Sequence, residues 1–262
     1  MTPSSPLLNE ISSPLVLSLR TRELVVDVHQ HSAWQVVYSL DHPFDSVIDG
    51  RDERGIYGFV LPPQVPHRCN TAHHTLLVIN VEALSGAGAR LASWLGEGAA
   101  PLIWRWRSAP LERSPLALPA QAQPAALGLA LHQSLCALAT PESPDERVAR
   151  ALAILARDCA QRVDLRRLAR QVHLSPSRLG ALCKAQTGSS LSKHLLWMRI
   201  RLAIRLALGA PERLHRRSLS DIAAMSGFHD LPQLDRTMNA MMGVAPSTLR
   251  DHSDLIQAFP VR

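Results

Sequence analysis

The first third of the chain consists of short apolar runs separated by turn residues. Between residues 16 and 81 the runs are LVLSL, ELVVDV, WQVVYSL, YGFVL and TLLVINV. The segments DHPFD and IDGRDERG lie between them and are expected to form turns. No helical period interrupts the series, and short strands at this spacing are typical of a small antiparallel sandwich or barrel. We therefore predict an antiparallel β-barrel within residues 1–108.

The pattern changes after the strands. GARLASWLGEG is expected to be a helix and PLIWRW a strand, and residues 109–124 carry four prolines, which is a linker composition. Residues 125–139 and 144–163 then place apolar residues at three- and four-residue steps, as amphipathic helices do. In the second segment Val148, Leu152, Leu155 and Cys159 form one stripe. Because a stripe of this kind packs on its own domain or on a second subunit, residues 109–160 are interpreted as a linker with interdomain or homodimer helices.

Residues 164–188 have the pattern of two short helices joined by a tight turn. Asp164 can cap a helix over LRRLARQV, and Ser175 can cap a second one with Pro176 at its first position, where proline is tolerated. The second helix is expected to bury Leu179, Leu182 and Cys183 and to end at Thr187-Gly188. Two helices so joined form a helix-turn-helix, whose second helix fits the major groove of DNA.

The same pattern returns after a long helix predicted over residues 190–209. That linker helix carries Leu195, Met198, Leu202 and Leu206 on one side and Arg199, Arg201 and Arg205 elsewhere. In the second unit the expected caps and turns are Ser218 or Ser220, Gly227, Asp230 and Gly243. Its expected inner residues are Ile222, Ala223, Met225, Leu234, Met238 and either Met241 or Met242. We predict that residues 161–262 form an all-α domain with two helix-turn-helix motifs joined by a linker helix.

Charge separates the two halves in the same way. The whole chain has a net charge of +6, but residues 161–262 contain 16 basic and 7 acidic residues, a net charge of +9. The preceding 160 residues therefore carry a net charge of −3. A basic C-terminal domain indicates a polyanion partner, and double-stranded promoter DNA is the partner that fits the helix-turn-helix pattern.

Composition narrows the class of protein. Apolar residues make up 46% and charged residues 19% of the chain, as expected of a globular protein. No apolar run is long enough for a transmembrane helix, and the first residues lack the pattern of a signal peptide. Four scattered cysteines suit reduced thiols better than disulfides. We expect a cytoplasmic protein without a membrane partner.

Residues from about 162 to 250 resemble the DNA-binding domain of the AraC/XylS transcription regulators. The motifs are LARQVHLSPSRLGALCKAQTGSSLSKHLLWMRIRLAIRLA and SLSDIAAMSGFHDLPQLDRTMNAMMGVAPSTLR. The second keeps the skeleton of that family at Ile222, Ala223, Gly227, Phe228, Gly243, Val244, Pro246 and Arg250. The resemblance implies a bacterial regulator whose two second helices enter major grooves one helical turn apart.

The chain departs from that family at several positions. Cys183 stands where a large aromatic residue is usual, and Leu234, Met238 and Met242 replace frequent phenylalanines. Ala181, Asn239 and Ala240 stand where basic or polar residues are frequent. The candidate readers of DNA are Ser177, Arg178 and Lys184 in the first motif and Leu231, Gln233, Asp235 and Arg236 in the second. Because the second motif has lost positive charge, we expect it to bind DNA more weakly than the first.

Histidines in the first half suggest a sensor site. His29, His31 and Gln35 form an HxHxxxQ pattern, and His67 ends a PxxxPH pattern. The pair resembles a cupin barrel and the sensor half of some AraC-type regulators, with Gln35 in place of the usual carboxylate and Gln64 in place of a glycine. Three histidines can bind zinc, nickel or iron. A metal effector, an organic small-molecule effector without metal, and a purely structural role all remain open at this point.

We therefore expect a transcription regulator, not an enzyme, whose promoter binding is controlled by an effector in the N-terminal barrel. RNA polymerase is a further partner if the protein activates transcription. The main alternative is a cupin metalloenzyme, such as a dioxygenase, fused to a DNA-binding module. A repair protein that uses Cys183 or Cys69 as a methyl acceptor is a weaker alternative, because neither cysteine has an activating motif beside it.

Overall fold

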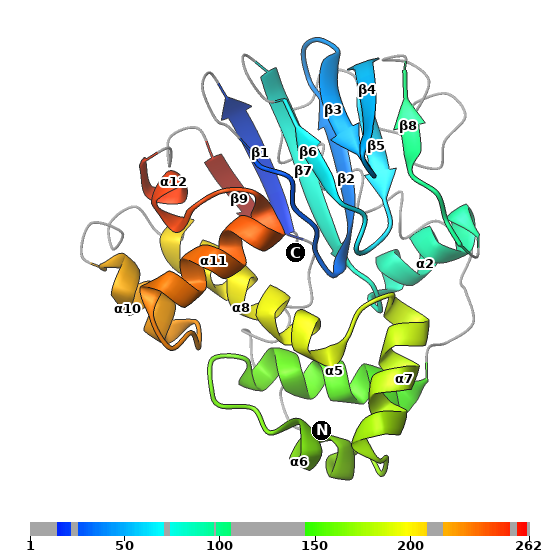
Figure 1. Cartoon of the computed structure of the whole chain (residues 1–262), viewed down its shortest axis with the longest axis vertical. Helices are drawn as coiled ribbons and strands as arrows, with labels where there is room; N and C mark the ends of the chain where they lie inside the picture. The colour runs from blue at the N-terminus through cyan, green and yellow to red at the C-terminus, as the bar shows by residue number, and fades with distance from the viewer. Residues whose placement is uncertain are drawn as a thin grey trace.

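The computed structural model describes residues 15–21, 26–70, 74–96, 98–105, 145–208, 217–251 and 256–260. Strands occupy the first part of this range and helices most of the second, as Figure 1 shows. The predicted proline-rich linker and the helix expected over residues 125–139 lie outside the described residues. The division into a β-rich N-terminal half and a helical C-terminal half is confirmed.

The strands form two antiparallel sheets. The six-stranded sheet has the order β8-β5-β2-β7-β1-β9, and the three-stranded sheet has the order β4-β3-β6. The first comprises β1 (Leu15–Thr21), β2 (Ala33–Ser39), β5 (Gly58–Leu61), β7 (His74–Glu82), β8 (Leu102–Trp104) and β9 (Ile256–Pro260). The second comprises β3 (Phe44–Ile48), β4 (Arg51–Ile56) and β6 (His67–Cys69). The described strands do not close into a barrel, so the expected β-barrel is corrected to a pair of sheets.

Two strands arise where the sequence indicated only turns. β3 and β4 form a hairpin whose turn residues, Asp49 and Gly50, have φ values of 50° and 75°. A turn with positive φ at both central residues matches the twist of a hairpin, and Asp-Gly is a favoured pair there. β4 escapes prediction because five of its six residues are exposed or half-exposed, and only Ile56 is buried. A polar outer strand has little apolar alternation for the sequence to reveal.

The last strand also was not expected. β9 lies within the C-terminal range that the sequence assigned to an all-α domain, yet it pairs antiparallel with β1 from Ile256 to Pro260. The end of the chain thus returns to the N-terminal sheet (Figure 1).

The helical half is built around one long helix. The helix α8 (Leu191–Leu208) is flanked by the first helix-turn-helix, α6 (Leu165–Gln171) and α7 (Pro176–Thr187), near one end. The second motif, α10 (Leu219–Met225) and α11 (Leu231–Met242), lies near the other end (Figure 1). The remaining helices are α2 (Gly86–Leu95), α5 (Glu146–Asp158) and α12 (Pro246–Asp251). The predicted pair of motifs joined by a linker helix is confirmed.

The helix ends follow the sequence signals. The side chains of Asp164, Ser175 and Asp230 cap α6, α7 and α11 by accepting hydrogen bonds from backbone N–H groups. Gly188 and Gly243 end α7 and α11 in the left-handed conformation, with φ values of 71° and 69°. Local capping chemistry therefore determines where each motif begins and ends.

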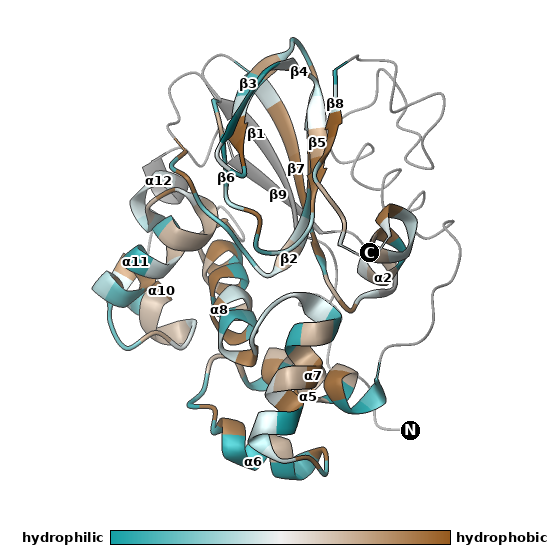
Figure 2. Cartoon of the chain, turned by 45° about the vertical axis from the view of Figure 1, so that its right-hand side comes forward, coloured by the Kyte–Doolittle hydropathy of each residue, from teal (hydrophilic) through white to brown (hydrophobic). Residues whose placement is uncertain are grey.

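The linker helix buries two faces instead of one. Leu195, Met198 and Leu202 of the predicted stripe pack with α5, α6 and α7. A second face with Trp197, Ile200 and Ile204 packs against residues from both sheets and from α10 and α11. Figure 2 shows α8 with apolar residues along much of its length between the sheets and the other helices. The two sheets and the second helix-turn-helix therefore share one continuous core.

Three details of packing differ from the sequence-based expectation. Met225, expected on the inner face of α10, has 44% of its surface exposed, while Ile222 and Ala223 are buried. Leu182 is only partly buried beside Leu179 and Cys183, which are fully buried. Arg201, expected only to lie away from the apolar stripe of α8, is itself buried at 3% exposure and forms an ion pair with Glu82 of β7.

The apolar stripe of α5 packs within this chain. Val148, Leu152, Leu155 and Cys159 are buried in one cluster with residues of α6, α7 and α8. The side chains that had two possible partners are thus used inside the helical half.

The cap of α10 provides a test of these local assignments. Ser218 and Asp221 form a reciprocal capping box, whereas Ser220 is an exposed residue within the helix. We expect Ser218→Ala to lower the free energy of unfolding by about 1 kcal/mol. Ser220→Ala should change it by less than about 0.5 kcal/mol, because it removes no cap. Urea unfolding of the two variants checks this, and equal effects would contradict the assignment of the cap.

Candidate functional site

The candidate DNA-contacting side chains of the two expected reading helices differ in how far they are exposed to solvent. Ser177, Arg178 and Lys184 of α7 are exposed, as is Arg236 of α11. Gln233 is partly buried, and its side-chain oxygen accepts a hydrogen bond from the backbone N–H of His229 at 2.8 Å. Gln233 therefore helps to cap α11 in addition to lying where a reader of DNA is expected.

Charge differs strongly between the two motifs. Residues 164–187, which span α6 and α7, contain five basic residues and one acidic residue, a net charge of +4. Residues 218–242, which span α10 and α11, contain one basic residue and three acidic residues, a net charge of −2. The first motif alone has the charge that a phosphate backbone attracts.

The three histidines of the N-terminal half come together. His29 and His31 precede β2 and do not lie within it, and His29 pairs with His67 through an isolated bridge with two backbone hydrogen bonds of 2.9 Å. The ring centroids of His29 and His67 are 4.2 Å apart, and those of His31 and His67 are 5.4 Å apart. One ligand nitrogen from each residue lies within 4.8 Å of the others. The structure thus assembles the predicted triad, although the expected strand is not what aligns it.

Each ring of the triad is oriented by a backbone carbonyl. The Nδ1 atoms of His29, His31 and His67 lie 2.8, 3.0 and 3.0 Å from the carbonyl oxygens of Asp27, Ala33 and Val65. Since a carbonyl oxygen can only accept, each Nδ1 must carry the proton, and each Nε2 of the neutral ring keeps its lone pair. The Nε2 atoms of His31 and His67 are buried and have no hydrogen-bond partner within the described residues.

Burial keeps these rings neutral. It is the largest effect on the pKa of all three histidines and lowers it in each case. For His31, burial and the neighbouring His29 lower the pKa to about 3. Neutral imidazole is the form that binds a metal ion or accepts a hydrogen bond from a ligand.

Gln35 lies beside His31 of the triad, and its side-chain amide is hydrogen-bonded to another residue. Its side-chain Nε2–H donates to Asn80 Oδ1 at 3.3 Å, and both residues are buried. Gln35 therefore lines the site together with Asn80 of β7.

The triad and the segment that carries it contact the helical half. The ring centroids of His31 and Trp197 of α8 are 5.1 Å apart. The backbone N–H groups of Asp27 and Gln30 donate to the carbonyl oxygens of Gly243 and Ala240, at 2.8 and 3.2 Å. The segment that carries His29 and His31 is therefore hydrogen-bonded to the end of the second reading helix.

Two further contacts surround this junction. Gln64, with a φ of 68°, occupies the left-handed region that the usual glycine of this motif would enter without strain. Its side-chain oxygen accepts a hydrogen bond from Lys193 of α8. Glu82 accepts hydrogen bonds from Trp197 Nε1, at 2.8 Å, and from Arg201. Each contact joins the sheets to the linker helix.

Comparison with known proteins identifies the helical half. Residues 168–252 match a family described as a helix-turn-helix domain. Residues 168–252 therefore form an AraC-type helix-turn-helix domain, which supports a role in DNA binding. No curated protein matches the chain significantly.

Solved structures of ToxT share the fold of this chain over most of its length. ToxT from Vibrio cholerae has a TM-score of 0.56 and 10% identity, with 93% of this chain and 98% of that chain covered. A fatty-acid-bound structure of ToxT has a TM-score of 0.52 and 11% identity, with coverage of 93% and 95%. The C-terminal domain of AraT, a response regulator from Geobacillus stearothermophilus, has 23% identity, a TM-score of 0.38 and coverage of 41% and 86%. At these identities the ToxT structures show a shared fold alone.

Sequence reasoning missed the residues that connect the triad to the AraC-type domain. Trp197 was not included in the predicted stripe of α8, although Trp197, Ile200 and Ile204 recur at helical spacing and could have indicated a second face. The contacts of Gly243 and Ala240 with Asp27 and Gln30 join residues more than 200 positions apart. No local signal predicts such pairs.

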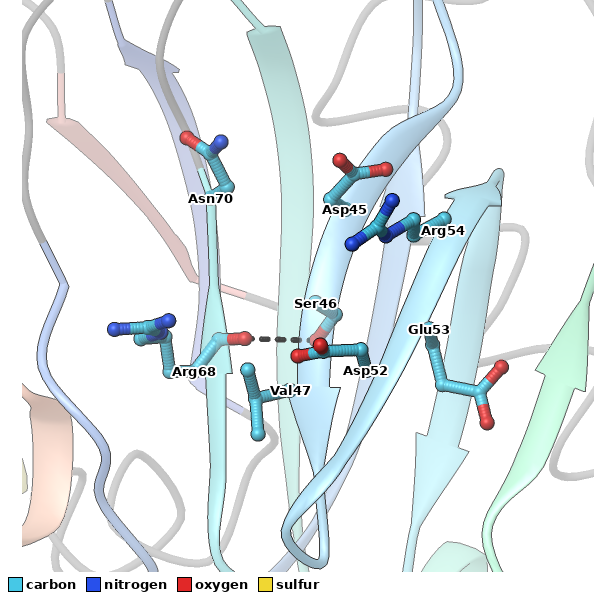
Figure 3. A pocket seen from close by; sticks show the side chains of 8 residues that line it. All are labelled: Asp45, Ser46, Val47, Asp52, Glu53, Arg54, Arg68 and Asn70. Carbon is cyan, nitrogen blue, oxygen red and sulfur yellow. Dashed lines mark hydrogen bonds between the residues drawn. The ribbon is translucent and has the colours of Figure 1, made fainter.

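A shallow hollow on the outer face of the three-stranded sheet is a different kind of place. It has a volume of about 230 Å³ and is lined by charges of both signs, among them Asp52, Arg54 and Arg68 (Figure 3). Ser46 Oγ–H donates to the Arg68 carbonyl, and Asp45 accepts from the Gly55 N–H at 2.9 Å. The first bond joins β3 to β6 and the second joins β3 to β4, so these polar groups hold the sheet together, and we assign the hollow no binding role.

The described cysteines do not support the methyl-acceptor alternative. Cys69 and Cys183 are buried, and burial raises the pKa of Cys69 to about 12 and raises that of Cys183. A buried thiol of high pKa is a poor nucleophile.

None of the helices in the described ranges is both long and apolar enough to cross a membrane.

Proposed function

We propose that the chain is a sequence-specific transcription regulator that binds promoter DNA through α7 and α11. The helix-turn-helix domain carries the proposal, because its two expected reading helices present exposed side chains such as Arg178 and Arg236. A helix of this kind enters the major groove, where side chains read the edges of base pairs. The proposed contacts are made by Ser177, Arg178 and Lys184 of α7 and by Leu231, Gln233, Asp235 and Arg236 of α11.

We further propose that an effector at the histidine triad controls this binding. One nitrogen of each imidazole lies within 4.8 Å of the others, which supports a divalent transition metal such as zinc, nickel or iron. Tetrahedral zinc holds nitrogen ligands about 2.0–2.1 Å from the ion, so its ligand atoms lie about 3.3 Å from one another. Such an ion would supply a positive charge that links the three rings, whose ligand nitrogens lie within 4.8 Å of one another.

The route of control would be the segment of residues 27–31. It carries two of the proposed metal ligands, and its backbone N–H groups bond to Gly243 and Ala240 of the second helix-turn-helix. A change in the position of His29 or His31 therefore acts directly on the end of α11. An effector that prefers one docked arrangement would shift the population of that arrangement and alter DNA binding at the second half-site.

An organic effector is the second candidate for the same site. ToxT, with which this chain shares its fold, has been solved with an unsaturated fatty acid bound. Gln35 and Asn80 supply polar side chains beside the triad that an organic ligand could contact. A metal-dependent dioxygenase would use the same three histidines, and turnover of a small substrate by the metal-loaded protein would distinguish it. The same proposal includes a homodimer, contact with RNA polymerase if the protein activates transcription, and a division of the chain into residues 1–108, 109–160 and 161–262.

DNA binding is tested by exchanging one arginine in each motif. We expect Arg178→Ala to weaken binding to a promoter fragment by about tenfold or more, which corresponds to about 1.4 kcal/mol. Arg236→Ala should weaken it less, because its motif has a net charge of −2 while that of Arg178 has +4. Fluorescence anisotropy at several salt concentrations measures both effects, and footprinting should show stronger protection over the half-site of α7.

The salt series separates the two roles of Arg178. Loss of a phosphate contact should reduce the magnitude of the slope of log affinity against log salt by about one. Loss of a base contact should instead change the sequence preference at one position. No loss of binding for Arg178→Ala on any DNA would remove this residue from the interface. A larger loss for Arg236→Ala than for Arg178→Ala would reverse the proposed order of the two motifs.

A further inference from the structure

A second cleft lies between the sheets and the helical half, away from the histidine triad. It has a volume of about 150 Å³ and is lined by residues 82–85 at the end of β7, by α5 and by His194 and Met198 of α8. None of its lining residues is His29, His31 or His67. A cavity of 150 Å³ is large enough to hold benzene.

Small side chains on α5 create this space. Ala149, Ala153 and Ala156 line it at helical spacing, together with Leu152. Met198 faces them from α8, and methionine adapts its shape to irregular ligands. The walls are therefore suited to a flat apolar group about one ring in size.

One of the two ring nitrogens of a buried histidine in this cleft has no hydrogen-bond partner within the described residues. His194 is 1% exposed, and its Nε2 lies 2.8 Å from Thr187 Oγ1. The hydroxyl hydrogen of Thr187 is directed to the carbonyl of Cys183 or Ser189, so Thr187 accepts from His194 and the Nε2 carries the proton. The Nδ1 atom then has a lone pair, and no hydrogen-bond partner for it lies within the described residues.

His194 stays a neutral acceptor in this environment. Burial lowers its pKa, and this effect exceeds the opposing one of Glu82, which raises it. A buried acceptor without a donor destabilises the folded chain, and a hydroxyl group on a bound molecule would remove that cost.

Charge limits what can occupy the cleft. Its lining contains no lysine or arginine, and its charged residue is Glu82, whose carboxylate accepts from Trp197 and Arg201. Carboxylates and phosphates would therefore enter without a countercharge and beside an acidic group. A single ring is enough to fill the volume of about 150 Å³.

We propose that this cleft binds a neutral single-ring molecule with a hydroxyl group, of the phenol class. The ring would lie between the alanines of α5 and Met198, and the hydroxyl would donate to Nδ1 of His194. The site touches β7 on one side and α5 and α8 on the other, so an occupant stabilises the arrangement in which these elements are packed together. Glu82 borders the cleft and also bonds to Trp197, whose ring contacts His31.

The proposal is tested with phenol on the full chain, using calorimetry and thermal unfolding. Phenol should bind and raise the melting temperature, and benzene should bind about fivefold to tenfold more weakly because it lacks the hydroxyl. Benzoate should not bind, because of its charge. Equal binding of phenol and benzene would overturn the role of His194, and binding of benzoate would overturn the charge argument.

Two matched variants locate the site. Ala153 and Ala224 are both exposed helical alanines, but only Ala153 lines the cleft. Ala153→Leu should fill the space and weaken phenol binding by at least tenfold, while Ala224→Leu should leave it unchanged. Unchanged binding in Ala153→Leu, or no binding of phenol to the wild-type chain, would overturn the proposal. Metal and DNA binding are measured separately, so this outcome is independent of the proposed function.

Discussion

His67→Ala is expected to abolish the stabilisation of this protein by divalent transition metals. His67 is 1% exposed, and its Nε2 lone pair has no hydrogen-bond partner within the described residues. A ligand at 100 times its dissociation constant stabilises the folded state by about 2.7 kcal/mol. Loss of one of three ligands should lower the affinity by more than about 100-fold, since even the partners of ligands contribute 10- to 100-fold. Thermal unfolding with and without Co²⁺, Zn²⁺ or Ni²⁺ measures the effect.

The control for this variant is another histidine of the same half. His42 is exposed and lies outside the triad, so His42→Ala should keep the full metal-dependent shift. Co²⁺ provides a second readout, because its visible absorption reports the number and geometry of its ligands. If no metal stabilises the wild-type protein, the triad is a polar lining for an organic effector and the metal proposal is wrong.

Gly243→Ala is expected to separate the second reading helix from the histidine segment. A Cβ atom at this position would lie 2.7 Å from His29 Nδ1 and would also collide with the carbonyl oxygen of Asp27. Segment 27–29 must therefore move, and the hydrogen bond from Asp27 N–H to Gly243 must lengthen or break. We expect Co²⁺ binding to weaken by about tenfold or more, although Gly243 is not a ligand, because coupling between sites is reciprocal.

Gly188→Ala is the matched control. Gly188 ends α7 as Gly243 ends α11, with φ values of 71° and 69°, so both substitutions carry the cost of about 1 kcal/mol for a side chain in this conformation. The nearest atom to a Cβ at Gly188 is 3.8 Å away, which is an ordinary contact. Hydrogen exchange of α11 and Co²⁺ titration should therefore change in Gly243→Ala alone. Equal changes in both variants would mean that the triad and α11 are not coupled.

Together these variants examine one physical link. Lys193 with Gln64, and Trp197 and Arg201 with Glu82, attach the linker helix to the sheets near the same place. The N-terminal half is thus joined to the second motif, whose net charge of −2 is unfavourable for DNA. An effector that acts on the second motif would adjust specificity and affinity while the first motif, with its net charge of +4, keeps the protein on DNA.

The DNA-binding half could be predicted in detail because its signals are local. Caps at Asp164, Ser175 and Asp230 and glycine ends at Gly188 and Gly243 lie within one turn of the helices they delimit. Capping chemistry and helical period act over a few residues, so the sequence contains all the information needed. Met225 was placed wrongly, because its exposure depends on which distant element packs against it.

By itself, the sequence determined the class of the protein, the positions of both helix-turn-helix motifs and the four side chains of the candidate sensor site. Only the tertiary structure decided that the sheets do not close within the described strands, that β9 returns to the N-terminal sheet and that the triad lies against Trp197 and the end of α11. These facts rest on contacts between residues far apart in the chain. Their free energy comes from burial and hydrogen bonding across elements, which no local pattern of residues specifies.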